Sequence, residues 1–402
     1  MSASPELRVG LAGAGFLAAT RARCWRRVHG VRVALTAVGA SRAERAEAFA
    51  REHAVGAAVV GLDALVSRDD VDVIDVCLPN DLHREAVERA TAAGKAVICT
   101  KPFTAYTGQG LPADASDADV AAVDRRVMAR HAIADARAML AAAESAGLPL
   151  MYGENWLYAP PIVRAAGLLA EGRGALLELR GEEAHSGSHA EYALRWRHAG
   201  GGALLRLGAH PIGAMLHLKR VEGTARDGKP IGVTHVTAEV ADPQAGAPED
   251  VQRSLAHAPR DVEAWGCAVL HFADGSRGTA FGSDLALGGM RSRLELRTTD
   301  ARLACNLSPH DQLRAYTPDE GGYGDSYVME KVHGQAGWST PLPDEDWGSG
   351  QQGMVQAFAE AAVRGETPAA DGALGVEVTR VLCAAYVSAS EGRRVTLDEL
   401  EG

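Results

Sequence analysis

The stretch LRVGLAGAGFLA at residues 7–18 places a glycine-rich turn directly after a short apolar run. The turn has the pattern G-x-G-x-x-A, and a helical stretch follows it to about Val28. In such a strand–turn–helix the first glycine permits the tight turn, the second lets the backbone approach a pyrophosphate, and free N–H groups at the helix start face the phosphates. We therefore predict dinucleotide binding by Gly13, Gly15, Phe16 and Leu17. Glycines that serve only the turn are the alternative.

Strand and helix patterns alternate through the first 150 residues. Buried parallel strands are typically short apolar runs, and the residues between them show helical periodicity. We predict further strands at 31–39, 57–60, 71–79, 95–102 and 148–155, with helices at 42–53, 83–94 and 117–146. This βαβ alternation predicts a doubly wound parallel sheet, a Rossmann domain.

The pattern changes from about residue 175. Strand patterns and hairpin turns such as Ala273-Asp274-Gly275-Ser276 now follow one another, which favours antiparallel pairing. We expect helices at 160–171, 208–219, 352–364 and 374–390. The fold class is α/β: a dinucleotide-binding domain at 1–150 and an α+β domain with a mainly antiparallel sheet at 151–402.

Composition excludes several classes of function. The 402 residues include 41 Lys and Arg against 52 Asp and Glu, a formal charge of −11. An acidic surface disfavours nucleic acid and anionic membranes as partners. The sequence shows neither a run of about 18 apolar residues nor a signal-peptide pattern. Six dispersed cysteines without metal-like spacing read as reduced thiols, so we expect a cytoplasmic protein and no metal site.

The end of the second strand bears on the choice between NAD and NADP. An acidic residue there would bind the ribose 2′-OH of NAD. The chain instead has Gly39-Ala40-Ser41-Arg42. Ser41 can donate to a 2′-phosphate and Arg42 can pair with it, which favours NADP over NAD. The alternative is a helix N-cap at Ser41 with Arg42 in a solvated first turn.

Four segments resemble the glucose–fructose oxidoreductase / inositol dehydrogenase / MocA (Gfo/Idh/MocA) family: GAGFLA at 13–18, LPNDLH at 78–83, KAVICTKPF at 95–103 and GGGALLRLGAHPIG at 200–213. The resemblance implies a Rossmann domain followed by a large open sheet for substrate binding and oligomerisation. It also implies an NAD(P)-dependent oxidoreductase acting on a hydroxyl of a sugar, glycoside or cyclitol, and a homodimer or homotetramer.

The resemblance assigns catalysis to Lys101 and His210. Lys101 follows the fifth strand, where its ammonium would polarise the substrate oxygen, and an imidazole suits proton exchange with an alcohol. Acidic residues usual in the family are replaced by Thr100, Arg206 and Gly213. This leaves open whether ordinary redox turnover is retained.

Arg206 precedes His210 by four residues, so on one helix the two would share a face. In the pocket, Arg206 would lower the pKa of His210 by like-charge repulsion and offer its guanidinium to an anionic or carbonyl-bearing substrate. The alternative is that Arg206 points away and pairs with Glu182 or Glu183.

Further candidates are weaker. By the family pattern Pro79, Asn80 and His83 line the cofactor, although His83 is equally consistent with simply beginning a helix. We predict substrate binding by residues after the strand at 148–153 and by one later histidine: Glu154, Asn155, Trp156, Tyr158 and His185. Trp156 and Tyr158 are alternatively core residues. His185 and His189 lie four apart but lack the further ligands of a metal site.

Two other functions remain open. A cofactor-retaining enzyme could use transient oxidation for elimination or epimerisation. A dinucleotide-binding sensor or interaction protein without chemistry would explain the missing acids, whereas Lys101 and His210 argue against it.

Overall fold

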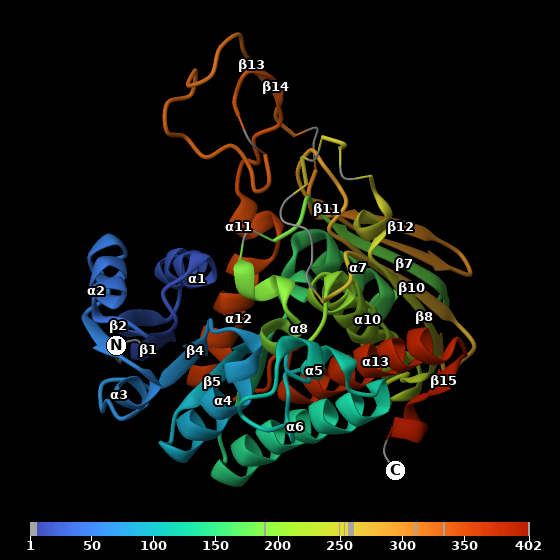
Figure 1. Ribbon diagram of the computed structural model, residues 1–402, viewed down its shortest axis with the longest axis horizontal. Coiled ribbons are helices and arrows are strands. Elements are labelled where there is room, and N and C mark those ends of the chain that lie inside the picture. The colour runs from blue at the N-terminus through green and yellow to red at the C-terminus, as the bar shows by residue number, and fades with distance from the viewer. Residues whose placement is uncertain are drawn as a thin grey trace.

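The computed structural model describes residues 6–400 except 189, 249, 253, 256–260, 310–311 and 333. A parallel six-stranded sheet forms the amino-terminal part, with strand order β3-β2-β1-β4-β5-β6 (Figure 1). Its strands are β1 (Glu6–Ala12), β2 (Arg32–Ala40), β3 (Ala57–Val60), β4 (Val73–Val76), β5 (Ala96–Thr100) and β6 (Leu150–Gly153). The predicted Rossmann domain is confirmed, and all six carboxyl ends lie at one edge of the sheet.

The helices between these strands largely follow the predicted periodicity. They are α1 (Phe16–Arg26), α2 (Ala43–Glu52), α3 (Leu62–Val66), α4 (His83–Ala92), α5 (Asp117–Ala122) and α6 (Arg125–Ala146). The prediction of one helix over 117–146 is wrong. The chain leaves helical geometry at Val123, and Asp124 starts α6 by accepting hydrogen bonds from the N–H groups of Arg126 and Val127. The five-residue α3 was not predicted.

A seven-stranded sheet forms the second domain, in the order β12-β11-β7-β10-β9-β8-β15. Only β7 and β10 pair in parallel, so the prediction of a mainly antiparallel sheet is confirmed. Its strands are β7 (Leu176–Ala184), β8 (Val233–Ala241), β9 (Trp265–Phe272), β10 (Arg277–Ser283), β11 (Arg291–Thr298), β12 (Arg302–Asn306) and β15 (Val395–Thr396). A small hairpin, β13 (Ala315–Thr317) with β14 (Gly337–Ser339), projects beyond the sheet (Figure 1).

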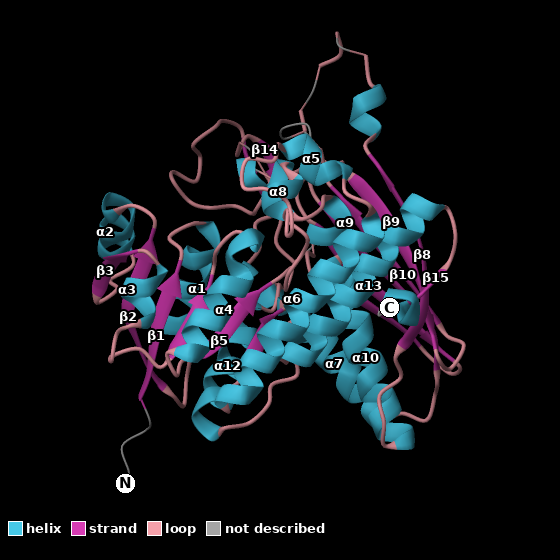
Figure 2. Cartoon of the chain, turned by 60° about the horizontal axis from the view of Figure 1, so that its bottom comes forward, coloured by secondary structure: helices cyan, strands magenta, loops and turns pink. Residues whose placement is uncertain are grey.

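Helices cover the face of this sheet that looks toward the Rossmann domain (Figures 1 and 2). Those that contact its strands are α7 (Pro160–Glu171), α9 (Ala203–Arg206), α10 (Ala209–Asp227) and α13 (Gly372–Glu391). Of the remaining helices, α8 (Trp196–Ala199) packs against α5, and α12 (Gln351–Arg364) packs against α1 of the Rossmann domain and against the short α11 (Glu345–Gly348). Short 3-10 turns are η1 (Asn80–Leu82), η2 (Asn155–Tyr158), η3 (Glu191–Leu194), η4 (Pro243–Gly246) and η5 (Leu397–Leu400).

Helix α13 is long and apolar enough to cross a membrane by length and composition alone, contrary to our expectation from the sequence. In the structure 67% of that stretch is buried inside the protein. Since α13 packs against α6 and β8, its apolar surface is that of a core helix.

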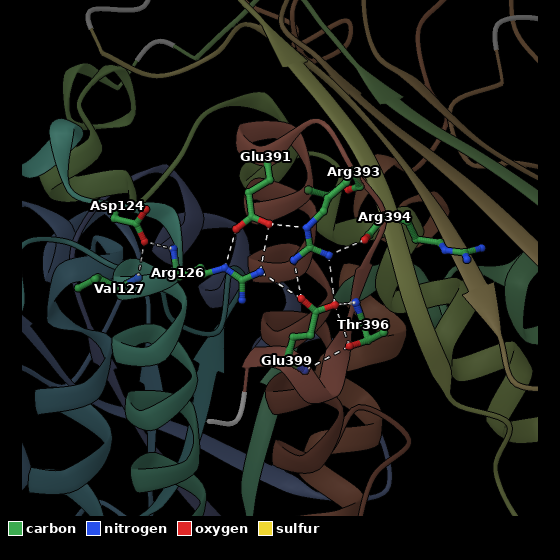
Figure 3. Close-up of polar contacts among 9 residues, drawn as sticks. Asp124, Arg126, Val127, Glu391, Arg393, Arg394, Thr396 and Glu399 are labelled. Atoms are coloured by element: carbon green, nitrogen blue, oxygen red, sulfur yellow. Dashed lines mark hydrogen bonds and ion pairs between the residues drawn. The ribbon is translucent and has the colours of Figure 1, made fainter.

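The two halves of the chain are joined by more than one connection. Strand β6 extends the Rossmann sheet to Gly153, just past the predicted boundary at 150, and α13 returns to pack on α6. Figure 3 shows a charged network where these helices meet: Arg126 binds Glu391 at 2.5 Å and Glu399 at 3.1 Å, and Arg393 binds both carboxylates. The carboxyl-terminal segment therefore stabilises the packing of both halves.

Candidate active site

The turn between β1 and α1 fits a dinucleotide. Gly13 has φ +112, and a Cβ there would lie 2.5 Å from the carbonyl oxygen of Cys77. Gly15 is the N-cap residue of α1, so no capping side chain occupies the N–H groups of the first turn, and that turn contains no acidic residue. The N–H groups and positive dipole end of α1 are therefore available to an anion such as a pyrophosphate. Phe16, 66% exposed, lies beside them.

The end of β2 carries no carboxylate. Ser41 and Arg42 are exposed, and Arg42, not Ser41, is the N-cap residue of α2, so the alternative of a cap at Ser41 is wrong. A residue that the sequence did not single out joins them here. Arg45 donates from Nε to the carbonyl oxygen of Ala14 at 3.2 Å, which holds its guanidinium beside the glycine turn.

Two side chains of the segment after β4 hold neighbouring backbone segments in place. Asn80 donates from Nδ2 to the carbonyl oxygen of Ala199 at 2.6 Å. His83 begins α4 and is fully buried. Its Nδ1 lies 3.1 Å from the carbonyl oxygen of Pro102, and its Nε2 lies 3.0 Å from that of Leu78. Both side chains thus link backbone segments, and contact of either residue, or of Pro79, with a cofactor stays a prediction.

A histidine and a buried carboxylate meet at the carboxyl edge of the Rossmann sheet. Nδ1 of His210, in the first turn of α10, lies 2.6 Å from Oε1 of Glu154, which follows β6 and is fully buried. The same Glu154 oxygen accepts a hydrogen bond from the N–H of Trp156, so it is an acceptor and Nδ1 of His210 carries the proton. Nε2 is therefore the free basic nitrogen.

Lys101 completes this group directly after β5. Its Nζ donates to the main-chain carbonyl oxygen of Arg206 at 2.5 Å. Burial lowers the pKa of Lys101, the charges of Glu154 and Glu183 oppose that shift, and Arg206 adds to it. Burial also lowers the pKa of His210, Lys101 lowers it further, and Glu154 raises it. A basic imidazole nitrogen and an ammonium group therefore occupy one site.

The side chain of Arg206 lies among the residues of this site, but its partner differs from both predictions. Helical structure is interrupted at Leu207 and Gly208, between α9 and α10, so Arg206 and His210 are not on one helix. The guanidinium pairs with Asp284, and both side chains are buried. The predicted cause of the low pKa of His210 is therefore wrong: burial and Lys101 produce it. Pairing with Glu182 or Glu183 is also wrong.

Three side chains of this site were not predicted as site residues, although Glu183 was named as an alternative partner of Arg206. Asp284 follows β10, whose end lies beside the end of β7 because Ser283 pairs with Ala184. Glu183 points inward from β7, and burial raises its pKa to about 8. Lys331, only 6% exposed, lies near enough for the charges of Asp284 and Arg206 to shift its pKa. Glu183 could have been found from the sequence, because a charged residue at an inward position of an alternating strand indicates a buried polar site.

The predicted substrate residues differ in their surroundings. Trp156 is buried and its ring stacks on that of His210, with centroids 5.7 Å apart and planes 12° apart. Tyr158 accepts a hydrogen bond from the N–H of Ala370 and packs edge-on against Phe358, which favours the core alternative. Asn155 donates to the carbonyl oxygen of Ser349, so its amide also holds a loop.

His185 lies in the site, at the end of β7. Its Nδ1 accepts a hydrogen bond from the N–H of Gly187 and lies 3.6 Å from Oδ1 of Asp284. His189 lies outside the described residues. Within the described ranges no group of three His, Cys, Asp or Glu side chains could hold a metal ion.

Comparison with known proteins agrees with this geometry. Residues 7–131 match the family model "Oxidoreductase family, NAD-binding Rossmann fold", and residues 162–304 match "GFO/IDH/MocA C-terminal domain". The chain is 26% identical over 341 residues to D-xylose 1-dehydrogenase (NADP(+)) 2 of Haloferax volcanii, covering 84% of this chain and 83% of that protein. D-apiose dehydrogenase of Paraburkholderia graminis matches at 36% identity, but over only 27% of this chain and 22% of its own length.

Among solved structures, the chain is similar to GenD2 from gentamicin A biosynthesis, which was determined in complex with NAD. The TM-score is 0.77 at 26% identity, and the match covers 98% of this chain and 96% of GenD2. The shared architecture therefore includes both domains.

Proposed function

The chain belongs to the Gfo/Idh/MocA oxidoreductase family, and on that premise we propose that it transfers a hydride between a nicotinamide cofactor and a hydroxyl or keto carbon of a sugar, glycoside or cyclitol. The observation that carries the proposal is the meeting of Lys101, His210 and Glu154 at the carboxyl edge of the Rossmann sheet, the edge that also holds the glycine turn.

Each of the three residues has a distinct task. Nε2 of His210 accepts the hydroxyl proton as the alcohol is oxidised to a carbonyl. Glu154 holds the proton on Nδ1 and stabilises the imidazolium that results. The ammonium of Lys101 donates a hydrogen bond to the substrate oxygen, where negative charge develops. Reduction uses the same groups in the reverse order.

Gly13, Gly15 and the first turn of α1 would hold the pyrophosphate of the cofactor. When bound, the nicotinamide ring supplies the acceptor or donor of the hydride. The intact Lys101–His210–Glu154 group favours this enzyme over a sensor that has lost its chemistry.

The test is a screen of neutral sugars, glycosides and cyclitols with both cofactors, read by the near-ultraviolet absorbance of reduced nicotinamide. Lys101→Ala and His210→Ala should each lower turnover by about 100-fold or more. Cofactor binding should remain nearly intact, because neither side chain lies at the glycine turn. Near-normal turnover in either variant would contradict the role assigned to that residue.

We also propose that the protein binds NADP at least as well as NAD. Ser41, Arg42 and Arg45 support this preference, since they place a hydroxyl and a guanidinium just after β2 and a second guanidinium beside the glycine turn, while β2 itself ends without a carboxylate. Titration of both cofactors should show that Arg42→Ala weakens NADP more than NAD. Arg51→Ala, on the last turn of α2, is the matched control. A preference for NAD that Arg42→Ala leaves unchanged would refute the proposal.

A homodimer or homotetramer through the second sheet is a further part of the proposal. Trp265, Val269 and Phe281 alternate with the inward residues of β9 and β10 and are only half-buried on the face away from the helices. Such an apolar face is suited to a second copy of the chain. Analytical ultracentrifugation should show an oligomer that Val269→Glu dissociates. A monomeric protein would refute this part.

A further inference from the structure

Buried polar atoms without a hydrogen-bond partner gather around Lys101. Protein interiors satisfy most such atoms, so at a cluster of exceptions ordered water or a bound ligand completes the hydrogen bonding. Four of those found among the described residues belong to side chains whose charges act on Lys101 or on each other: Oε2 of Glu154, Oε2 of Glu183, Nε of Arg206 and Oδ1 of Asp284. A ligand rich in hydroxyl groups would satisfy them, because each hydroxyl both donates and accepts.

The ion pair between Arg206 and Asp284 determines the charge that such a ligand can carry. The pair is buried and leaves one donor, Nε of Arg206, and one acceptor, Oδ1 of Asp284, without partners. Since each charge is already neutralised by the other, an anionic ligand gains little from Arg206, and the pair offers no net positive charge to offset the cost of desolvating a carboxylate. A neutral hydroxyl can use both atoms without disturbing the pair.

The second domain supplies Glu183 and Asp284 to the site. Asp284 and Glu183 lie at the neighbouring carboxyl ends of β10 and β7 in the second domain, whereas Lys101 and Glu154 follow strands of the Rossmann sheet. Glu183 faces the site because inward residues alternate along β7. Burial raises its pKa, which favours the protonated carboxyl, a group able to donate as well as accept.

We propose that Glu183, Arg206 and Asp284 form a hydroxyl-binding subsite that selects neutral polyols over acidic sugars. The subsite contacts hydroxyl groups away from the reacting carbon. This inference rests on the proposed function for the site in which the polyol lies, and it replaces the expectation of an anionic substrate that Arg206 suggested in the sequence.

The experiment compares matched ligands on the protein with its cofactor bound. The probes are methyl glycosides of glucose and galactose and the methyl glycosides of the corresponding uronic acids (methyl uronides), in which a carboxylate replaces the primary alcohol. Binding is followed by calorimetry and turnover by cofactor absorbance. We expect the neutral member of a pair to be preferred by at least about tenfold. Preference for the uronide would overturn the subsite.

Variants assign the preference to these residues. Asp284→Asn leaves Arg206 unpaired and should shift the ratio toward the uronide by about tenfold or more, whereas Arg206→Gln/Asp284→Asn restores overall neutrality and should return the preference to the neutral glycoside. An unchanged ratio in Asp284→Asn would also overturn the proposal.

Two variants of Glu183 test the subsite independently of whether Asp284→Asn folds. Glu183→Leu removes hydrogen bonding and should weaken the neutral glycoside by about tenfold, while Glu183→Gln should bind it nearly as the unaltered protein does. Equal binding by both variants would contradict the role of Glu183.

The outcomes separate this inference from the proposed function. Saturable binding of a neutral glycoside without any change in cofactor absorbance, across the whole polyol screen, would contradict the proposed function and leave the subsite standing. Turnover that favours the uronide would contradict the subsite and leave the function standing. Absence of binding by every probe would contradict both.

Discussion

Replacement of Glu154 by Gln tests whether this buried carboxylate positions and tunes His210. The substitution keeps the size of the side chain and removes its charge. Nδ1 of His210 lies 2.6 Å from Glu154 Oε1, and the imidazolium that forms during oxidation depends on that charge. A buried hydrogen bond to a charged group contributes about 1.5–3 kcal/mol, so we expect kcat to fall roughly 10- to 100-fold.

The pH profile gives a second, independent readout. His210 must be neutral to accept a proton, so the rate rises as pH increases through its pKa, which burial holds below the ordinary value of 6.5. Glu154 raises that pKa. Removing its charge should therefore lower the pKa and move the acid limb of the profile to lower pH, even as the plateau falls.

The assay measures kcat and kcat/KM across the pH range with saturating cofactor. The plateau of kcat gives the fall in rate, and kcat/KM reports the titrating group in the enzyme free of substrate. Thermal unfolding and cofactor titration establish that the variant folds and binds its cofactor. A merely structural Glu154 would lower the plateau without moving the acid limb. That result, or an unchanged plateau, would refute the reasoning.

Three further predictions concern the surroundings of the site and the core. Gly213→Ala should lower turnover because the new Cβ would lie 3.0 Å from Cγ of Glu154, whereas Gly167→Ala, which meets no atom within 4 Å, should leave turnover unchanged in the same assay. Lys219→Met should reduce the free energy of unfolding by about 3–5 kcal/mol in denaturant titrations, since it removes the buried cation beside Glu222 and leaves that carboxylate only the more distant, half-exposed Arg226; an unchanged midpoint would contradict this. Burial raises the pKa of Glu183 from 4.5 to about 8, so ionisation of this carboxyl destabilises the folded protein. Relative to Glu183→Gln, the unaltered protein should therefore lose free energy of unfolding as pH rises through that interval. Parallel curves of unfolding free energy against pH for the two proteins would contradict the raised pKa.

The Rossmann domain could be predicted from sequence because its signals are local. The turn at Gly13, each apolar strand and each amphipathic helix are recognised within about twenty residues, and the alternation of strands and helices predicts a parallel α/β sheet. The same local pattern placed Lys101 at the carboxyl end of β5. The N-cap of α6 at Asp124 was missed because a cap within a continuous helical pattern leaves the periodicity almost unchanged.

The polar partners of the site were decided by tertiary structure. Glu154 and His210 are 56 positions apart, and Arg206 and Asp284 are 78 apart, so no spacing rule connects them. The sequence determined which groups able to move a proton or carry a charge the chain possesses. The break at Gly208 and the parallel pairing of β7 with β10 decided which of them meet. A buried charge has to find its partner across the fold, because isolated burial is too costly, and only the packed domains show which partner that is.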